Sequence, residues 1–226
     1  MESKTETLVR LEIKLVDTAF AGIRDLRDEV EKGATEEPWF GRLLISILNS
    51  TLREYLHLKI GHQKSTPFLS WACRNLLELS IFSKYICVSK ANANRFVDDR
   101  IVDGIEIFES FRLWAEHVRP GQQLPGLDQV LGRLKKEQAK AVQGGTKFLR
   151  TSELAKIVGM QKEFQYMNKL CSKTVHPTAW SVLTEINEGE LKAFRPILLF
   201  SGVHYGLQIH ATIKTHLDKF GPEPPV

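Results

Sequence analysis

Apolar residues recur at intervals of three and four along most of this chain, and this spacing constrains the fold more than any other feature. Near the N-terminus it runs from Leu8 through Val16 and Ile23 to Val30. Such spacing gathers apolar side chains on one side of a helix. The alternation of apolar and polar residues that is typical of strands does not persist anywhere. The sequence therefore predicts an all-α fold.

Prolines, glycines and capping residues divide the chain into successive helices. Pro38 and Pro67 suit the first turns of two of them, and the Pro- and Gly-rich stretch 119–126 is a break. We expect helices over residues 4–33, 38–61, 67–86, 92–118, 127–142, 151–158, 161–175 and 191–220, with one or two turns within 178–186. Four or more of these helices are long, and most connections are short. We therefore predict an antiparallel bundle with a small helical cap.

The domain organisation follows from where the apolar spacing stops and resumes. The segment 119–150 is highly charged and lacks core positions, whereas the apolar spacing returns after it. We therefore expect one helical domain over residues 1–220, with 119–150 as a surface excursion. The tail 221–226 is expected to be disordered.

Composition narrows the cellular setting. The chain has 31 basic and 27 acidic residues among 226, a modest excess that permits nucleic acid as a partner without arguing for it. Its three cysteines lack metal-ligand spacing, so we expect reduced thiols. The charged N-terminus has no apolar leader, and no stretch is apolar enough to cross a bilayer. We predict a cytoplasmic protein with no membrane partner.

An ion pair is expected inside the most apolar helix. In WACRNLLELSIFSKYI (71–86), Arg74 and Glu78 are four residues apart and share one side of the helix with Ser70. In water such a pair contributes only about 0.3–0.5 kcal/mol, whereas burying two ions costs several kcal/mol unless other groups satisfy them. The pair is therefore either a structural lock or part of a binding or catalytic site.

A second polar stripe is expected on the helix within 161–175. Asn168, Ser172 and His176 follow one another at four-residue intervals, with Tyr166 close by. His176 stands before Pro177 at a helix end, where the terminal carbonyls favour a charged imidazole. An imidazole near a hydroxyl suits acid or base chemistry. A plain surface helix and a satisfied structural histidine are the alternatives.

These two segments together carry a resemblance. The motif R-x-x-x-E in CRNLLEL and the motif S-x-x-x-H-P in YMNKLCSKTVHP resemble a widespread microbial family of all-helical proteins that is catalogued only as a domain of unknown function. The likeness spans about 65–180. It implies an all-helical fold with a clustered polar site, and it implies no particular activity.

A remote resemblance to the HEPN superfamily of helical nucleases rests on one match. That superfamily places an Arg and a His on one helix, and RLWAEH offers Arg112 and His117. The match is poor, because Leu113 stands where a polar residue usually follows the Arg and a spacing of five splays the two side chains apart. A composite site that joins Arg74 to His176 would perform similar metal-independent chemistry.

The histidines do not predict a metal site. His57 and His62, and likewise His204, His210 and His216, are five or six residues apart and do not share a helix face. No phosphate-binding glycine loop is present either. We expect no cofactor and no metal.

The leading hypothesis is a clustered polar site between helices, built from Arg74, Glu78, Ser172 and His176, with Tyr166 and Asn168 as ligand-binding residues. It binds or cleaves a phosphate-bearing ligand such as RNA. The alternative is an interaction or oligomerisation module, in which Arg74, Glu78 and His176 are structural and the first and last helices join copies into a homo-oligomer. The sequence does not decide whether the protein is an enzyme.

Overall fold

The computed structural model describes residues 4–33, 35, 37–122, 124–140, 150–175 and 193–220. All elements among them are helices and none is a strand, which confirms the predicted all-α fold. The helices are α1 (Lys4–Glu31), α2 (Pro38–Lys64), α3 (Thr66–Val88), α4 (Lys90–Val118), α5 (Pro125–Gln138), α6 (Thr151–Ile157), α7 (Gln161–Val175) and α10 (Arg195–Phe220).

The chain forms two compact units. Unit 1 consists of Met1–Cys87 and Thr151–Val226, and unit 2 is Val88–Arg150. The segment 119–150, predicted to be an excursion, therefore belongs to a unit that also includes α4. The expectation of a single domain over 1–220 stays a prediction, and the tail 221–226 lies outside the described residues.

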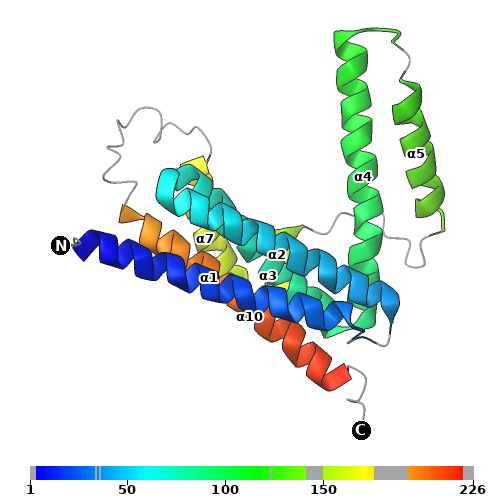
Figure 1. The fold of residues 1–226 in the computed structure, drawn as a ribbon. Coiled ribbons are helices and arrows are strands. Elements are labelled where there is room, and N and C mark those ends of the chain that lie inside the picture. Colours follow the sequence, from blue (N-terminus) through cyan, green and yellow to red (C-terminus); the bar gives the residue numbers. More distant parts are fainter. Residues whose placement is uncertain are drawn as a thin grey trace. The chain divides into compact units, whose positions relative to one another are not determined.

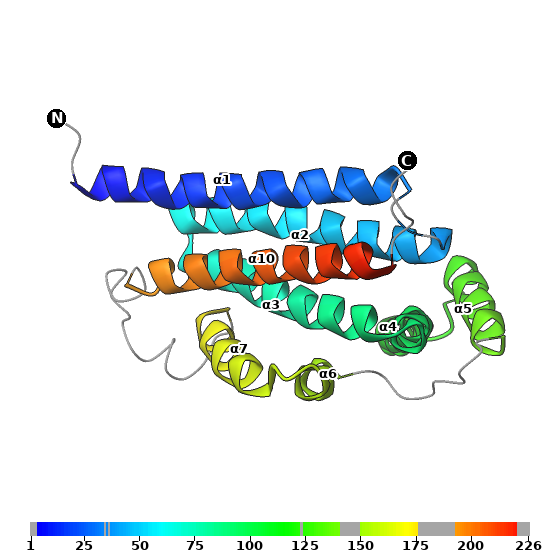
Figure 2. The same ribbon diagram turned by 90° about the horizontal axis from the view of Figure 1, so that it is seen from below.

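Unit 1 is a layered bundle of helices. In Figure 1, α1, α2 and α10 lie side by side, and in Figure 2 α6 and α7 lie on the side of α3 that faces away from α1. Leucine and isoleucine side chains such as Leu48, Leu76 and Ile209 are fully buried between the helices. No described helix has an apolar stretch long enough to span a bilayer.

A glycine pair allows α2 and α10 to approach closely. A Cβ atom on Gly206 would lie 1.9 Å from the Tyr55 hydroxyl oxygen, and one on Gly202 would lie 2.6 Å from Leu58. The Tyr55 hydroxyl donates to the Val203 carbonyl oxygen at 3.2 Å. Because neither contact leaves room for a side chain, glycine at both positions sets the packing of α10 on α2.

Side chains tie the turn between α2 and α3 to α10. The Ser65 hydroxyl accepts from the Phe68 backbone N–H at 3.4 Å, near the start of α3. The Arg195 guanidinium donates to the Thr66 hydroxyl at 2.8 Å and to the His62 carbonyl oxygen at 3.2 Å. A cation at the carbonyl end of α2 also complements the helix dipole. The turn therefore holds the α2–α3 pair in a defined arrangement.

Unit 2 is a helical hairpin of α4 and α5. Lys135 pairs with Glu109 at 2.6 Å, and this contact lowers the pKa of the Glu109 carboxyl. Gly104 lies against α5, since a Cβ there would be 3.3 Å from Leu134.

Candidate functional site

The predicted ion pair forms on α3. Arg74 Nε lies 3.1 Å from Glu78 Oε1, and the two side chains are 32% and 25% exposed. Ser70, predicted to lie on the same side, is fully buried. The pair thus stands at the margin of the core, where water screens it less than on an open surface.

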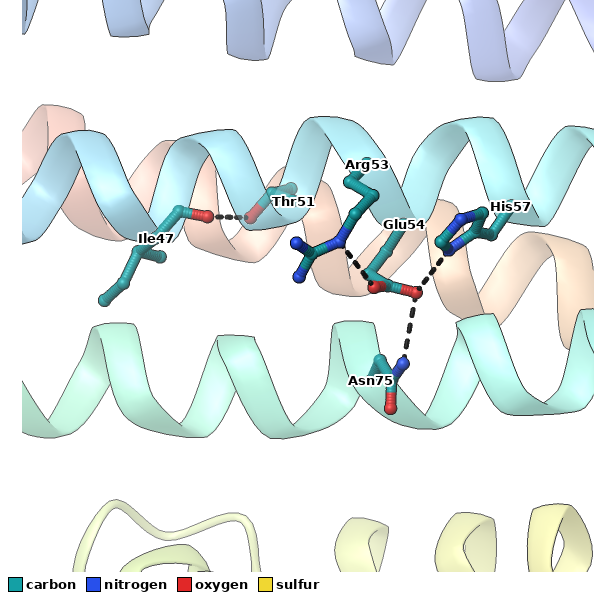
Figure 3. A network of polar contacts seen from close by, with 6 residues as sticks. All are labelled: Ile47, Thr51, Arg53, Glu54, His57 and Asn75. Atoms are coloured by element: carbon teal, nitrogen blue, oxygen red, sulfur yellow. Dashed lines mark hydrogen bonds and ion pairs between the residues drawn. The ribbon is translucent and has the colours of Figure 1, made fainter. Parts of the chain in front are cut away.

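A buried carboxylate on α2 contacts α3 at Asn75, the residue that follows Arg74. The Glu54 side chain is only 3% exposed. Its oxygens accept from Asn75 Nδ2 of α3 at 3.1 Å and from His57 Nδ1 at 3.2 Å, while Arg53 Nε lies 3.5 Å away (Figure 3). Asn75, His57 and Arg53 thus donate to the Glu54 carboxylate. These contacts offset the cost of burying its charge.

The contact with Glu54 orients the His57 ring. A carboxylate only accepts hydrogen bonds, so Nδ1 carries the hydrogen and Nε2 is left with its lone pair in the neutral ring. The imidazole also packs against the rings of Phe68 and Trp71, with centroids 5.2 Å away in each case. A carboxylate that fixes the tautomer of an imidazole is an arrangement used in general acid–base catalysis.

We call this surface the α2–α3 face. It comprises Arg53, Glu54 and His57 of α2 together with Phe68, Trp71, Arg74, Asn75 and Glu78 of α3. Helical spacing explains the grouping, because residues three, four and seven apart lie on one side of a helix. Two guanidinium groups, an oriented imidazole and two aromatic rings are therefore neighbours on one surface.

The other predicted site residues lie on α7 or beyond it. Tyr166 is 74% exposed, whereas Asn168 and Ser172 are half-buried. The Asn168 side-chain oxygen is buried without a hydrogen-bond partner in the described part of the chain. His176 and Pro177 lie outside the described residues. The joining of Arg74 to Ser172 and His176 in one site therefore stays a prediction.

Helices α3 and α7 meet through two thiols. Cys73 and Cys171 are both fully buried, and a hydrogen bond between them, together with burial, raises the pKa of Cys73. Asn168 precedes Cys171 by three residues and so lies on the same side of α7. Helices α3 and α7 thus touch at these two cysteines.

The HEPN-like match does not form a compact pair. Arg112 and His117 are both exposed on α4. Five residues along a helix place two side chains about 140° apart around its axis. The structure shows no nuclease motif at these residues.

The profile described as "Family of unknown function (DUF5677)" matches residues 69–191, which is more than half of the chain. The chain belongs to this family. Membership in DUF5677 confirms the predicted resemblance to a domain of unknown function.

The DUF5677 match begins within α3 and ends beyond α7. It includes Arg74, Glu78, Ser172 and His176, whereas Glu54 and His57 precede it. Searches of curated proteins and of solved structures find no match. The comparisons thus supply the family and no activity.

The DUF5677 match does not include α2. Glu54 and His57 were likewise not identified as site residues from the sequence. His57 was considered only as a metal ligand, and in the described part of the chain no three metal-ligating side chains gather. The signal that would have revealed the α2–α3 face is the interval of three between Glu54 and His57 in the apolar stretch LREYLHLKI.

Proposed function

We propose that the α2–α3 face binds a phosphate-bearing ligand, and that this ligand is RNA. The observation that supports the proposal best is the buried Glu54 carboxylate held against His57 Nδ1 at 3.2 Å. Such a contact costs free energy to maintain in a core, and it leaves an oriented imidazole nitrogen for chemistry.

The charged groups and aromatic rings around the imidazole support the proposed binding of RNA. Arg53 is 64% exposed, so its guanidinium can turn from Glu54 to a phosphate. Arg74 is held by Glu78, which keeps its guanidinium on the same face. Trp71 is partly exposed and offers a ring on which a base of single-stranded RNA can stack.

The proposed reaction is cleavage of RNA by its own 2′-hydroxyl. His57 Nε2 takes the 2′-hydroxyl proton while the oxygen attacks the adjacent phosphorus. The bond from phosphorus to the 5′-oxygen breaks, and that oxygen leaves with a proton from a second acid, for which we propose His176. Arg74 stabilises the charge on the phosphate, and the products are a 2′,3′-cyclic phosphate and a 5′-hydroxyl.

The competing proposal is that the same residues only lock the bundle. The closed pair of Arg74 and Glu78 at four-residue spacing favours it, because each charge already has a partner. Under this proposal, Arg74→Ala and His176→Ala both lower the melting temperature strongly, and the double variant behaves as a single lesion.

The deciding experiment uses labelled single-stranded RNA in the presence of a chelator. Binding is followed by fluorescence anisotropy and cleavage by gel electrophoresis. We expect His57→Ala to lose cleavage by about 100-fold or more while it still binds. Arg74→Ala should weaken binding and reduce the salt dependence by about one phosphate contact.

Two controls make this test specific. His204→Ala changes an exposed histidine on α10 and should leave both readouts unchanged. An all-deoxy oligonucleotide should bind but remain intact, because it lacks the attacking hydroxyl. The proposal is wrong if the wild-type chain does not bind RNA, and its catalytic step is wrong if His57→Ala cleaves as fast as wild type.

A further inference from the structure

Two cysteine side chains are in contact inside unit 1, where helices α3 and α7 meet. Cys73 of α3 and Cys171 of α7 are free thiols, and both are fully buried. A hydrogen bond joins them, so their sulfur atoms are neighbours. Neither thiol takes part in the proposed RNA chemistry. Two thiols that face each other across a helix pair can react with each other by forming a disulfide.

The third cysteine is remote from this pair. Cys87 lies on the same helix as Cys73, about 21 Å further along its axis at a rise of about 1.5 Å per residue. A disulfide joins residues whose Cα atoms are no more than about 7 Å apart. Burial also raises the pKa of Cys87 to about 12, so this residue remains a thiol at neutral pH. Cys87 therefore serves as an internal control.

Helix α7 is held less firmly than α3. Among the residues of α7, Cys171 is the only one that is buried, whereas α3 buries side chains along its whole length. Elements with few buried contacts open locally at a lower free energy than the whole protein unfolds. When α7 opens, it carries the Cys171 thiol into water, while Cys73 stays on α3.

A peroxide supplies the oxidant for a disulfide between the two. In the open form, the Cys171 thiolate attacks one oxygen of hydrogen peroxide, the O–O bond breaks, hydroxide leaves and Cys171 becomes a sulfenic acid. When α7 closes, the Cys73 sulfur attacks the sulfur of that sulfenic acid. The S–O bond breaks, and the hydroxyl group leaves as water with the Cys73 proton. Two thiols and one peroxide thus give one disulfide and two water molecules.

We propose that Cys73 and Cys171 form a peroxide-sensitive pair, in which Cys171 reacts first and Cys73 then forms the disulfide that fastens α7 to α3. The sulfur atoms must approach from contact to a bond length of about 2 Å, and α7, with its single buried side chain, can make this movement. Oxidation then holds the helix of Ser172 against the helix of Arg74. This proposal is independent of the RNA chemistry.

The first test treats the full chain with hydrogen peroxide and counts thiols in denaturant. Wild type should fall from three free thiols to one and lose the mass of two hydrogen atoms, and dithiothreitol should reverse both changes. Trypsin places the three cysteines in separate peptides, 65–74, 85–90 and 170–173. We expect 65–74 to be joined to 170–173 within one chain. Three remaining thiols, a link to 85–90 or a link between two chains would each overturn the proposal.

Single variants test the order of events. Cys87→Ser is the control and should lose two thiols, as wild type does. Cys73→Ser leaves Cys171 without its partner, so the sulfenic acid should persist and be captured by dimedone. Cys171→Ser should keep both of its thiols, because Cys73 and Cys87 stay on α3. Circular dichroism checks that each variant is folded. Dimedone on Cys73 of Cys171→Ser, or none on Cys171 of Cys73→Ser, contradicts the proposed order.

Amide hydrogen exchange measures whether the disulfide fastens α7. In the reduced chain, exchange should be faster in α7 than in α3. Oxidation should slow the exchange of α7 by about tenfold or more and leave that of α4 unchanged, and dithiothreitol should restore it. Equal exchange of α7 before and after oxidation would show that the disulfide does not hold this helix.

Discussion

The absence of a Cβ atom at Gly206 allows α10 to pack closely against Tyr55 of α2. The Tyr55 hydroxyl occupies the space that a side chain on residue 206 would need, and burial raises the pKa of that hydroxyl. Protein interiors are packed as densely as crystals of small organic molecules. A side chain at residue 206 would therefore fit only if α10 moved away from α2.

Gly206→Ala should therefore destabilise the protein by about 1–3 kcal/mol, because its Cβ forces α10 away from α2. Gly22→Ala is the matched control: a Cβ there meets only His210, at 4.0 Å, so the variant should be more stable by about 0.5–1 kcal/mol through helix propensity. Urea denaturation measures both. If the two variants have equal stability, the close approach at Gly206 is not as described.

Residue-level prediction succeeded where partners are close in sequence and failed where they are distant. Arg74 and Glu78 are four residues apart on one helix, so their pairing follows from helical geometry. Glu54 receives a hydrogen bond from Asn75, 21 residues away, and that contact exists only because α3 packs along α2. No spacing rule within one helix could have shown that Glu54 is buried.

At the level of elements, Ser89 defines where α4 begins. Its hydroxyl accepts from the Asn92 backbone N–H at 3.1 Å, in the usual manner of a serine at a helix start. The sequence had placed this start at residue 92, two residues after the observed Lys90. Capping chemistry, which apolar spacing does not detect, accounts for such shifts.

Ser89→Ala should cost about 1 kcal/mol and should increase amide hydrogen exchange in the first turn of α4, because one backbone donor loses its acceptor. Ser46→Ala serves for comparison. Ser46 Oγ donates to the Arg42 carbonyl oxygen within α2, so its loss should be neutral or slightly stabilising. Equal exchange in wild type and Ser89→Ala would argue against the cap.

At the level of the whole molecule, apolar spacing predicted the helices, whereas their division into two units is seen in the structure. The highly charged segment 119–150 was expected to be a surface excursion, and the structure groups it with α4 in unit 2. Ile107, Phe111, Trp114 and Val118 of α4 have the spacing of a core helix, yet each is at least half exposed. Spacing alone does not distinguish a face that is buried within the chain from one that remains exposed.

The stability of unit 1 should depend on pH through His216. Its ring lies 5.0 Å from that of Phe40, and Nδ1 lies 3.2 Å from the Cys87 carbonyl oxygen. Burial lowers the pKa of His216 below its ordinary 6.5. The unfolded chain therefore binds a proton that the folded chain resists, so the free energy of unfolding falls as the pH drops from 6.5 toward the lower pKa.

His216→Gln keeps a donor for the carbonyl but cannot titrate, so it should lose less stability than wild type between about pH 8 and about pH 5. Denaturation curves at the two pH values give the comparison. The other titrating groups are the same in wild type and in the variant. The difference between their losses of stability therefore reports on His216 alone. Equal losses would show that His216 does not contribute.

The hydrogen bond from Asn75 to Glu54 crosses the N-terminal boundary of the family match, which begins at residue 69. One half of this polar surface thus comes from the shared domain, and the other half comes from the helix that precedes it. A relative that matches 69–191 but has a different helix before it would place other side chains against the position of Asn75. The leading helix would then act as an exchangeable part, and the chemistry of each relative would depend on which helix it carries.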